Sequence, residues 1–480
     1  MDNKVLKFFK EISKIPRPSG KEELISRYII NFAIERNLKY ISDKYNNVII
    51  FKEASKGYET NSSIILQSHM DMVCAKTKNS THNFDTDPLE LIEYDDYISA
   101  NNTTLGADNG IGVAIALAIL DDNTLKHPKL EVIFTTEEET TMNGAKYIDL
   151  SMLTSKKMIC LDNMSEDELW IGCASSHEWT CYLEPEYRLL GDNQYTLYTI
   201  DFYGFAGGHS GTDIGKKRGN PILLMSSLLQ ELSMQTQIYI NSIVGGTRLN
   251  VIPTRCKCNI FINEKDIDII EKIILENKLK ILKEFDLENR IKIEFYKNEQ
   301  EQDKKVFSNK SMNNMLQFLN SYKNGALKRD KDENVVLSSN FGVIDSTQGN
   351  IELHFSMRSN EEIYVSELVN DIDNKINKYE LHIKNFLELP GYEHKKTSDF
   401  INKCKIEYMK YFNKKPKLIK MHVGLEAGFF NSKIPNLDFV AIAPNIWDAH
   451  SPNERVSISS TNKVYEYIIE LLKNYKDITY

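Results

Sequence analysis

The chain has 480 residues, of which 41% are hydrophobic and 26% are charged, and its formal net charge is −9 at pH 7. One hydrophobic core rarely extends over this length, so we expect two domains. The mild acidity argues against nucleic acid as a partner, because phosphate binding needs a concentrated basic face. The longest apolar run, 111–120, is shorter than the roughly 20 residues that span a bilayer, and the charged start lacks the apolar core of a secretory signal. We therefore expect a cytoplasmic protein without a membrane partner.

The first part of the chain alternates strand and helix patterns. Ser19 and Glu22 predict a capping box that opens a helix. Short apolar runs predict strands at 47–51, 63–67, 130–135, 158–161 and 169–173, with a helix at 110–120 between the second and third. The runs lack polar alternation, as expected for strands that are covered on both faces. These patterns predict an α/β layered domain.

The composition changes after about residue 185, and the first pattern returns at about residue 390. Between these points the sequence predicts strands at 197–205, 238–244, 250–262 and 351–357, and helices at 222–232 and 361–379. Beyond them it predicts helices at 398–412 and 461–475 and a strand at 437–443. The simplest interpretation is an α/β domain built from residues 1–185 and 390–480, interrupted by an inserted α+β domain at 186–389.

Side chains that can bind a metal follow several of the predicted strands. His69 and Asp71 come directly after the strand at 63–67, and their spacing of two points both side chains to the same face. A histidine that binds a metal needs such a carboxylate to orient it. Further candidates lie in four other segments: Asp108, the run Glu137 to Glu139, Asp162 and His450. Ligands of an open α/β sheet bind outside the carboxyl ends of its strands, so five segments could meet at one edge.

Two histidines and three carboxylates suit zinc or a similar divalent ion. A carboxylate that bridges two ions, about 3.5–4 Å apart, gives a pair of open-sided sites that can activate a shared water. One further carboxylate must stay unligated to accept the proton of that water, and the run of three glutamates offers candidates for both tasks. Each acidic residue alone is more often a solvated surface group, and each histidine more often an ordinary partly buried one. The prediction depends on their convergence.

The segment 68–73, Ser-His-Met-Asp-Met-Val, resembles the first metal motif of the di-zinc exopeptidase family, which includes Xaa-His dipeptidases, carboxypeptidases and deacylases. Segments similar to the other motifs of this family follow in the same order, at 105–112, 136–145, 161–162, 207–211 and 450–452. The segments 15–20, 219–221, 248–253 and 422–426 look like the Xaa-His dipeptidase branch, which is aminoacyl-histidine-specific and carnosinase-like. The resemblance implies a three-layer metallopeptidase catalytic domain with an inserted α+β lid domain.

The resemblance also implies a role for each metal-site residue. Asp108 would bridge two divalent ions. His69 and Asp162 would bind one ion, and Glu139 and His450 the other. Of the remaining groups, Asp71 would orient His69 and Glu138 would be the general base. The ions would be zinc, with manganese or cobalt as alternatives, since imidazole and carboxylate ligands accept all three.

Three residues of the inserted domain acquire roles in the same way. His209 would help to stabilise the oxyanion of the tetrahedral intermediate, although the residues 207–211 by themselves indicate only a flexible turn that presents an imidazole. Asn250 and Arg358 would hold the free carboxylate of the substrate, because arginine binds carboxylates bidentately. An exposed arginine in a strand is otherwise usually just solvated.

The sequence departs from the resemblance after the glutamate run. Thr140 and Thr141 stand where dipeptidases of the family usually have small residues. Three consecutive glutamates also leave two registers open. Counting back from the segment 142–145 favours Glu138 and Glu139 over Glu137 and Glu138.

These observations together predict a metal-dependent dipeptidase that hydrolyses small peptides of the Xaa-His type. By resemblance we expect a homodimer that forms through the lid. One alternative is a carboxypeptidase or an N-acyl amino acid deacylase with the same metal centre. Another is a non-catalytic binding protein, which the loss of a ligand would have favoured; none is missing from the sequence.

Overall fold

The computed structural model describes residues 4–191, 194–285, 290–299, 304–394 and 398–475. The chain divides into two compact units. Unit 1 consists of Met1–Cys173, His394–Met421 and Leu425–Tyr480, and unit 2 consists of Ala174–Glu393 and His422–Gly424. Each unit has its own sheet and its own hydrophobic core. None of the described helices is both long and apolar enough to cross a membrane.

Unit 1 contains an eight-stranded sheet in the order β1-β2-β6-β3-β7-β23-β8-β22. The strands of this sheet are β1 (Lys39–Ser42), β2 (Val48–Lys52), β3 (Ile64–His69), β6 (Leu130–Thr135), β7 (Lys157–Cys160), β8 (Glu168–Cys173), β22 (Lys417–Met421) and β23 (Asp438–Ala441). At its centre β3 pairs in parallel with β6 and β7, and β7 pairs in parallel with β23. All residues of β3 and β6 are buried, as in a sheet that is covered on both faces. The carboxyl ends of these strands therefore lie at one edge.

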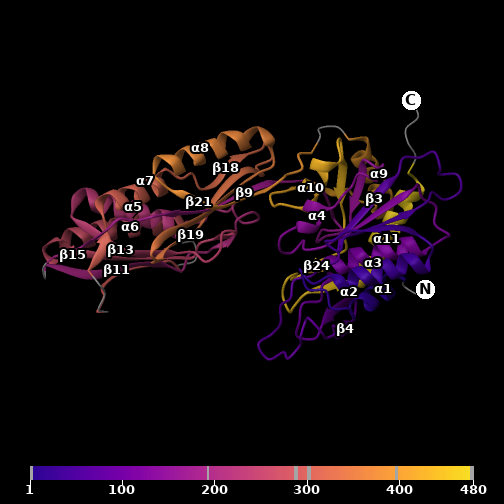
Figure 1. Ribbon diagram of the computed structural model, residues 1–480, viewed down its shortest axis with the longest axis horizontal. Coiled ribbons are helices and arrows are strands. Elements are labelled where there is room, and N and C mark those ends of the chain that lie inside the picture. Colours follow the sequence, from indigo (N-terminus) through magenta and orange to yellow (C-terminus); the bar gives the residue numbers. More distant parts are fainter. Residues whose placement is uncertain (1–3, 192–193, 286–289, 300–303, 395–397, 476–480) are drawn as a thin grey trace. The chain divides into compact units, whose positions relative to one another are not determined.

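Unit 1 contains seven described helices (Figure 1). They are α1 (Lys4–Ile12), α2 (Glu23–Glu35), α3 (Ala107–Asp121), α4 (Asn143–Tyr147), α9 (Asp399–Phe412), α10 (Glu426–Lys433) and α11 (Ile458–Lys473). Five of them, α1, α2, α3, α9 and α11, contribute apolar side chains to its main core. In α3 all the residues from 107 to 120 are buried, because this helix is apolar on every side. A small second sheet has the order β24-β25-β5-β4. Its strands are β4 (Leu91–Tyr94), β5 (Tyr97–Ala100), β24 (Ile446–Trp447) and β25 (Arg455–Ser457).

Unit 2 is built on an antiparallel sheet in the order β16-β11-β15-β13-β19-β20-β9-β21, with β18 paired to β19. These strands are β9 (Ser175–Leu183), β11 (Tyr195–Tyr203), β13 (Ile238–Gly245), β15 (Arg255–Asn263), β16 (Lys292–Lys297), β18 (Gly325–Arg329), β19 (Val335–Gln348), β20 (Asn350–Ser359) and β21 (His382–Leu389). Two small sheets pair β10 (Tyr187–Leu189) with β17 (Lys305–Phe307) and β12 (Gly208–His209) with β14 (Val251–Ile252).

The helices of unit 2 lie along one face of its large sheet (Figure 1). They are α5 (Pro221–Gln235), α6 (Ile267–Phe285), α7 (Asn309–Ser321) and α8 (Val365–Lys378), with short 3₁₀ turns η1 (Glu264–Asp266) and η2 (Glu362–Tyr364). Burial alternates along β9 and β15, as expected when one face of an antiparallel sheet packs on helices. At the start of α5 the Asn220 side chain accepts the N–H of Ile222, and Pro221 occupies the first turn, where no donor is needed.

The predicted mixed α/β fold is confirmed, and two local predictions need correction. Ser19 does not cap a helix, because its hydroxyl contacts Thr140 and α2 begins later, at Glu23. The single strand predicted at 250–262 is divided into β14 and β15, because Pro253 between them lacks an N–H for the ladder. Strand β9 was not predicted.

The unit boundaries also differ from the predicted domain limits of 185 and 390. The chain changes units after Cys173 and again after Glu393. The earlier change follows from β9, which pairs with β20 and β21 of the sheet of unit 2. The segment 422–424 belongs to unit 2 as well, although it lies beyond the predicted insertion.

Candidate metal centre

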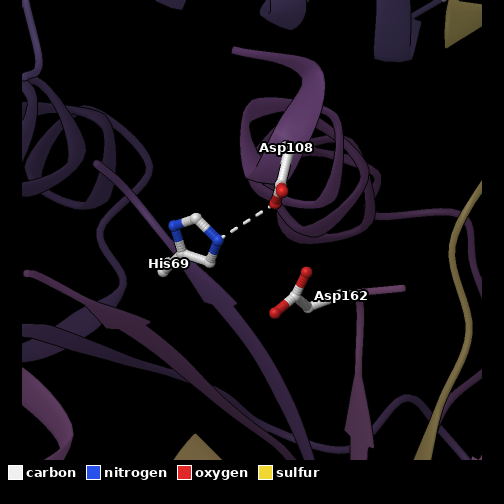
Figure 2. Close-up of side chains that lie close together, drawn as sticks. All are labelled: His69, Asp108 and Asp162. Atoms are coloured by element: carbon white, nitrogen blue, oxygen red, sulfur yellow. Dashed lines mark hydrogen bonds and ion pairs between the residues drawn. The ribbon is translucent and has the colours of Figure 1, made fainter. Parts of the chain in front are cut away.

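Side chains from five segments of unit 1 converge at the carboxyl edge of its central strands. They form three overlapping groups whose possible ligand atoms lie within 4.8 Å of one another: His69 with Asp108 and Asp162, His69 with Glu138 and Glu139, and Asp108 with Glu139 and His450. Figure 2 shows the imidazole of His69 and the carboxylates of Asp108 and Asp162 directed toward a common space. His69 ends β3, Asp108 lies in the first turn of α3, and Asp162 follows β7. All five predicted metal ligands are thus close together.

Asp108 lies between the two histidines. One of its carboxylate oxygens is 3.2 Å from Nε2 of His69, and the other is 3.1 Å from Nε2 of His450. The same nitrogen of His450 is 3.0 Å from Oε1 of Glu139. A carboxylate whose two oxygens face two different imidazoles has the geometry needed to bridge two ions.

Asp71 is fully buried behind this cluster. Its Oδ1 atom lies 3.3 Å from Nδ1 of His69, on the side of the ring opposite Asp108. Its two oxygens also accept the backbone N–H groups of Glu138 and Glu139, each at 3.1 Å. Asp71 thus has the contacts of a group that orients His69, together with the backbone of the loop after β6.

The three consecutive glutamates occupy different environments. Glu137 has a left-handed backbone, with φ of 55°, and its carboxylate accepts hydrogen bonds from the side chains of Thr141 and Asn143. It belongs to none of the three groups of possible ligands. Glu138 instead lies 4.0 Å from Nε2 of His69, and Glu139 contacts His450. Of the two registers left open by the sequence, the structure brings Glu138 and Glu139 into the cluster.

The electrostatics of the cluster favour a bound cation. Burial, followed by the negative charge of Asp108, raises the pKa of Asp162 to about 7. Burial likewise raises the pKa of Glu138 above its ordinary value, and the hydrogen bonds that His450 donates to Asp108 and Glu139 raise the pKa of His450 to about 11. Four carboxylates and only two imidazoles therefore lie close together, and of these side chains only that of His450 is exposed. Divalent cations would stabilise the ionised carboxylates, so these residues fit a pair of such ions.

The predicted site residues of unit 2 lie on neighbouring segments. Nδ1 of His209 faces the backbone N–H groups of Gly211 and Thr212, at 3.1 and 3.2 Å. A nitrogen that accepts these bonds carries no proton, so a neutral His209 ring has its N–H at Nε2 and can donate from there. Burial and the nearby Arg358 lower the pKa of His209, which favours this neutral form. Asn250 adjoins the same turn through its carbonyl, which accepts the N–H of Ser210 at 2.9 Å.

Arg358 is buried in β20, and its Nε atom has no hydrogen-bond partner among the described residues. A buried guanidinium without a full set of acceptors has a strong attraction for an added carboxylate. Near it lies His422, for which the sequence predicts no role. The ring nitrogens of His422 contact Ser338 and Asn360, and burial together with Arg358 lowers its pKa to about 3.

Glu426, which the sequence did not single out, is buried beneath the cluster of candidate ligands. Its carboxylate accepts hydrogen bonds from Gln67 at 2.7 Å and from Thr135 at 2.8 Å, and burial raises its pKa to about 8. The only signal in the sequence was its place in the segment 422–426, which gave no indication of its partners.

The fold and the ligand set define a class of protein, the hydrolases that activate water at a two-metal centre. Residues 65–474 match the model of peptidase family M20/M25/M40, and the chain belongs to this family. It is therefore a peptidase and a hydrolase, as predicted.

Relatives support the same assignment over the whole chain. The chain is 31% identical to the cytosol non-specific dipeptidase of Escherichia coli K12 over 470 residues, which cover 97% of this chain and 96% of that protein. The crystal structure of the aminoacylhistidine dipeptidase from Vibrio alginolyticus superposes with a TM-score of 0.89 at 27% identity, covering 100% of this chain and 98% of the other. A tripeptidase from Staphylococcus aureus shares the fold, with a TM-score of 0.56 at 13% identity and 98% coverage of both chains.

Proposed function

We propose that this chain is a metal-dependent dipeptidase that hydrolyses the peptide bond of small peptides. The observation that carries the proposal is the position of Asp108, whose carboxylate oxygens face His69 and His450 at 3.2 and 3.1 Å. The Escherichia coli relative, which is named as a dipeptidase and aligns with this chain over nearly its whole length, gives independent support.

The five close-lying side chains of unit 1 would hold two divalent ions. In this proposal Asp108 would be shared by the two ions, His69 and Asp162 would help to hold one, and Glu139 and His450 would help to hold the other. Zinc suits these imidazole and carboxylate ligands, as do manganese and cobalt. When bound, the ions supply Lewis acidity that lowers the pKa of water and polarises the substrate carbonyl.

Glu138 would transfer the protons of the reaction. Its carboxylate lies beside the proposed ligands, 4.0 Å from Nε2 of His69, and its backbone N–H is held by Asp71. Its pKa is raised by burial, so it can take a proton from the attacking water and return it to the leaving amine. Asp71 would keep His69 in the tautomer that presents Nε2 to the ion.

Unit 2 would bind the rest of the substrate and act as the lid. His209 would donate from Nε2 to the developing oxyanion, and Asn250 and Arg358 would hold the free carboxylate of the substrate. The buried guanidinium of Arg358 supports this assignment. From the family resemblance we also propose that the chain forms a homodimer through unit 2. The name of the Escherichia coli relative supports a cytoplasmic location.

The names of the relatives suggest two ranges of substrate. The Vibrio alginolyticus structure is named for aminoacyl-histidine dipeptides, and the Escherichia coli relative is named as non-specific. We propose that Xaa-His dipeptides are substrates of this chain. Whether other dipeptides are cleaved equally well is answered by the same experiment.

The test uses purified protein that is stripped of metal with a chelator and reloaded separately with zinc, manganese or cobalt. Each form is given Xaa-His dipeptides, other dipeptides, tripeptides and N-acyl amino acids. We expect cleavage of free dipeptides only after reloading. Cleavage of N-acyl amino acids alone would instead favour the deacylase alternative, and metal binding without any turnover would favour a binding protein.

A further inference from the structure

Two charged side chains outside the proposed ligand set are buried next to the cluster of candidate ligands. Arg17, between α1 and α2, and Glu454, between β24 and β25, are each only 1% exposed. Charged residues are rarely buried so completely without a specific partner. Their partners are backbone groups of the segments that carry His69 and Asp108.

Glu454 binds the loop that leads into α3. Its Oε2 atom accepts the backbone N–H groups of Leu105 and Gly106, at 2.8 and 3.0 Å. Its Oε1 atom accepts those of Ala107 and Asp108, at 2.8 and 3.2 Å. One carboxylate thus holds four consecutive amides, the last of them belonging to the proposed bridging residue. Because Glu454 lies only four residues after His450, it ties the Asp108 loop to the His450 loop.

Arg17 binds the same loop from another direction. Its Nη2 atom donates to the carbonyl of Gly106 at 2.6 Å, and its Nη1 atom donates to the carbonyls of Met70 and Asp71, at 3.0 and 3.3 Å. The guanidinium therefore links the Asp108 loop to the end of β3, where His69 lies.

The loop is shaped to admit this guanidinium. A Cβ atom on Gly106 or Gly110 would lie only 2.6 or 2.5 Å from Nη2 of Arg17, and Gly106 has a positive φ of 63°. The peptide groups of Gly106 donate to Glu454 on one side and accept from Arg17 on the other. Two opposite buried charges thus fix a single glycine between them.

We propose that Arg17 and Glu454 are positioning residues that hold the backbones carrying His69, Asp108 and His450 at the separations that two metal ions require. The inference rests on the proposed metal centre and is independent of the substrate. Neither residue touches an ion or the reacting atoms. They act by removing backbone freedom that metal binding would otherwise have to remove.

Glu131 provides a matched control. Like Glu454 it is a buried carboxylate that accepts backbone N–H groups, but its partners are not in the loops that carry the proposed ligands. It is fully buried in β6 and its carboxylate accepts the backbone N–H groups of Thr154 and Ser155, at 3.0 and 3.1 Å. It belongs to none of the groups of possible metal ligands. A Glu131→Gln substitution therefore removes a buried carboxylate from backbone amides without touching the segments of the metal cluster.

The experiment compares Glu454→Gln, Arg17→Lys and Glu131→Gln with the wild-type chain. Thermal unfolding of the metal-free proteins measures stability, and competition with a coloured chelator measures zinc stoichiometry and affinity. We expect both glutamine variants to lose stability. Only Glu454→Gln and Arg17→Lys should bind zinc more weakly, by about 10- to 100-fold, as for other residues that orient metal ligands. If Glu454→Gln does not fold, Glu454→Asp shortens the side chain while keeping its charge and is expected to give the same loss of affinity.

The outcomes separate this inference from the proposed function. Wild-type affinity for zinc in folded variants of both residues would overturn the inference alone, as would an equal loss of affinity in Glu131→Gln. A wild-type chain that binds no divalent ion would overturn the proposed function and the inference together.

Discussion

One carboxylate oxygen of Asp71 accepts a hydrogen bond from the backbone N–H of Glu138 over a distance of 3.1 Å. The same oxygen lies 3.3 Å from Nδ1 of His69, and the other accepts the N–H of Glu139. One buried carboxylate therefore fixes an imidazole at the end of β3 and the backbone of the loop after β6. The proposed ligands and the proposed base share this one support.

We predict that Asp71→Asn weakens metal binding less than His69→Ala does. An asparagine has one oxygen where three donors converge, so it loosens His69 and the glutamate loop, whereas His69→Ala removes a ligand. We expect a fall of about 10- to 100-fold in kcat for Asp71→Asn, with metal stoichiometry retained. Metal titration and steady-state kinetics measure the two effects. Loss of metal equal to that in His69→Ala would indicate that Asp71 is itself a ligand.

We predict that Glu138→Gln keeps its metal and loses turnover. A glutamine preserves the shape of the side chain but cannot accept the proton of the attacking water, so kcat should fall by about 10²- to 10⁴-fold. The neighbouring variant Glu137→Gln is the control, because Glu137 lies outside the cluster and should retain activity. The opposite pattern, with Glu137 essential and Glu138 dispensable, would show that the base is misassigned.

We predict that Arg358→Met raises KM for free dipeptides by about 10- to 100-fold, because a charged hydrogen bond to the substrate is lost. The same variant should cleave C-terminally amidated dipeptides as the wild type does, since these lack the carboxylate. Arg255 is a matched control in unit 2, exposed on β15 and paired with Asp201, and Arg255→Met should leave KM unchanged. An equal rise in KM for free and amidated peptides would argue against carboxylate recognition.

We predict that His422 makes the chain less stable as the pH falls. The folded-state pKa is about 3, against an ordinary value near 6.5, so only the unfolded chain takes up a proton at pH 5. The stability that depends on a neutral His422 is fully present above pH 6.5 and is lost progressively as the pH falls toward 3. The free energy of unfolding should be lower at pH 5 than at pH 8 by at most about 2 kcal/mol from this group. Denaturant unfolding at pH 8 and pH 5 measures it.

His422→Gln should reduce the difference in unfolding free energy between the two pH values. His382→Gln, which changes an exposed histidine of β21, should leave that difference as in the wild type. If His422→Gln and the wild type lose equal stability on acidification, the imidazole is not the group responsible.

The sequence was most informative where apolar runs were uninterrupted. Strand β6 was predicted at its observed limits, and β3 and β8 within two residues, because strands buried on both faces leave a continuous apolar signal. Strand β19 was not predicted, because its first half contains Ser338, Ser339 and Asn340, all of them buried. Its polar residues conceal the usual pattern, since burial of a polar side chain depends on partners that are distant in the sequence.

The same distinction applies to the site. His69, Asp108 and Asp162 could be predicted to lie together, because each follows a strand or opens a helix at the same edge of the sheet. Arg17 and Glu454 could not, because their partners are backbone groups, which every residue has and which leave no trace in the sequence. Their roles become apparent only when the loop of Gly106 is folded between them.

The run of three glutamates has a consequence in evolutionary terms. Glu137 closes a turn in a left-handed conformation, so glycine, asparagine or aspartate could replace it at little cost. Glu138 and Glu139 cannot be replaced so easily, since the carboxylate of each belongs to the cluster of candidate ligands. Among homologues, the residue at position 137 should vary, whereas selection should retain glutamate at positions 138 and 139.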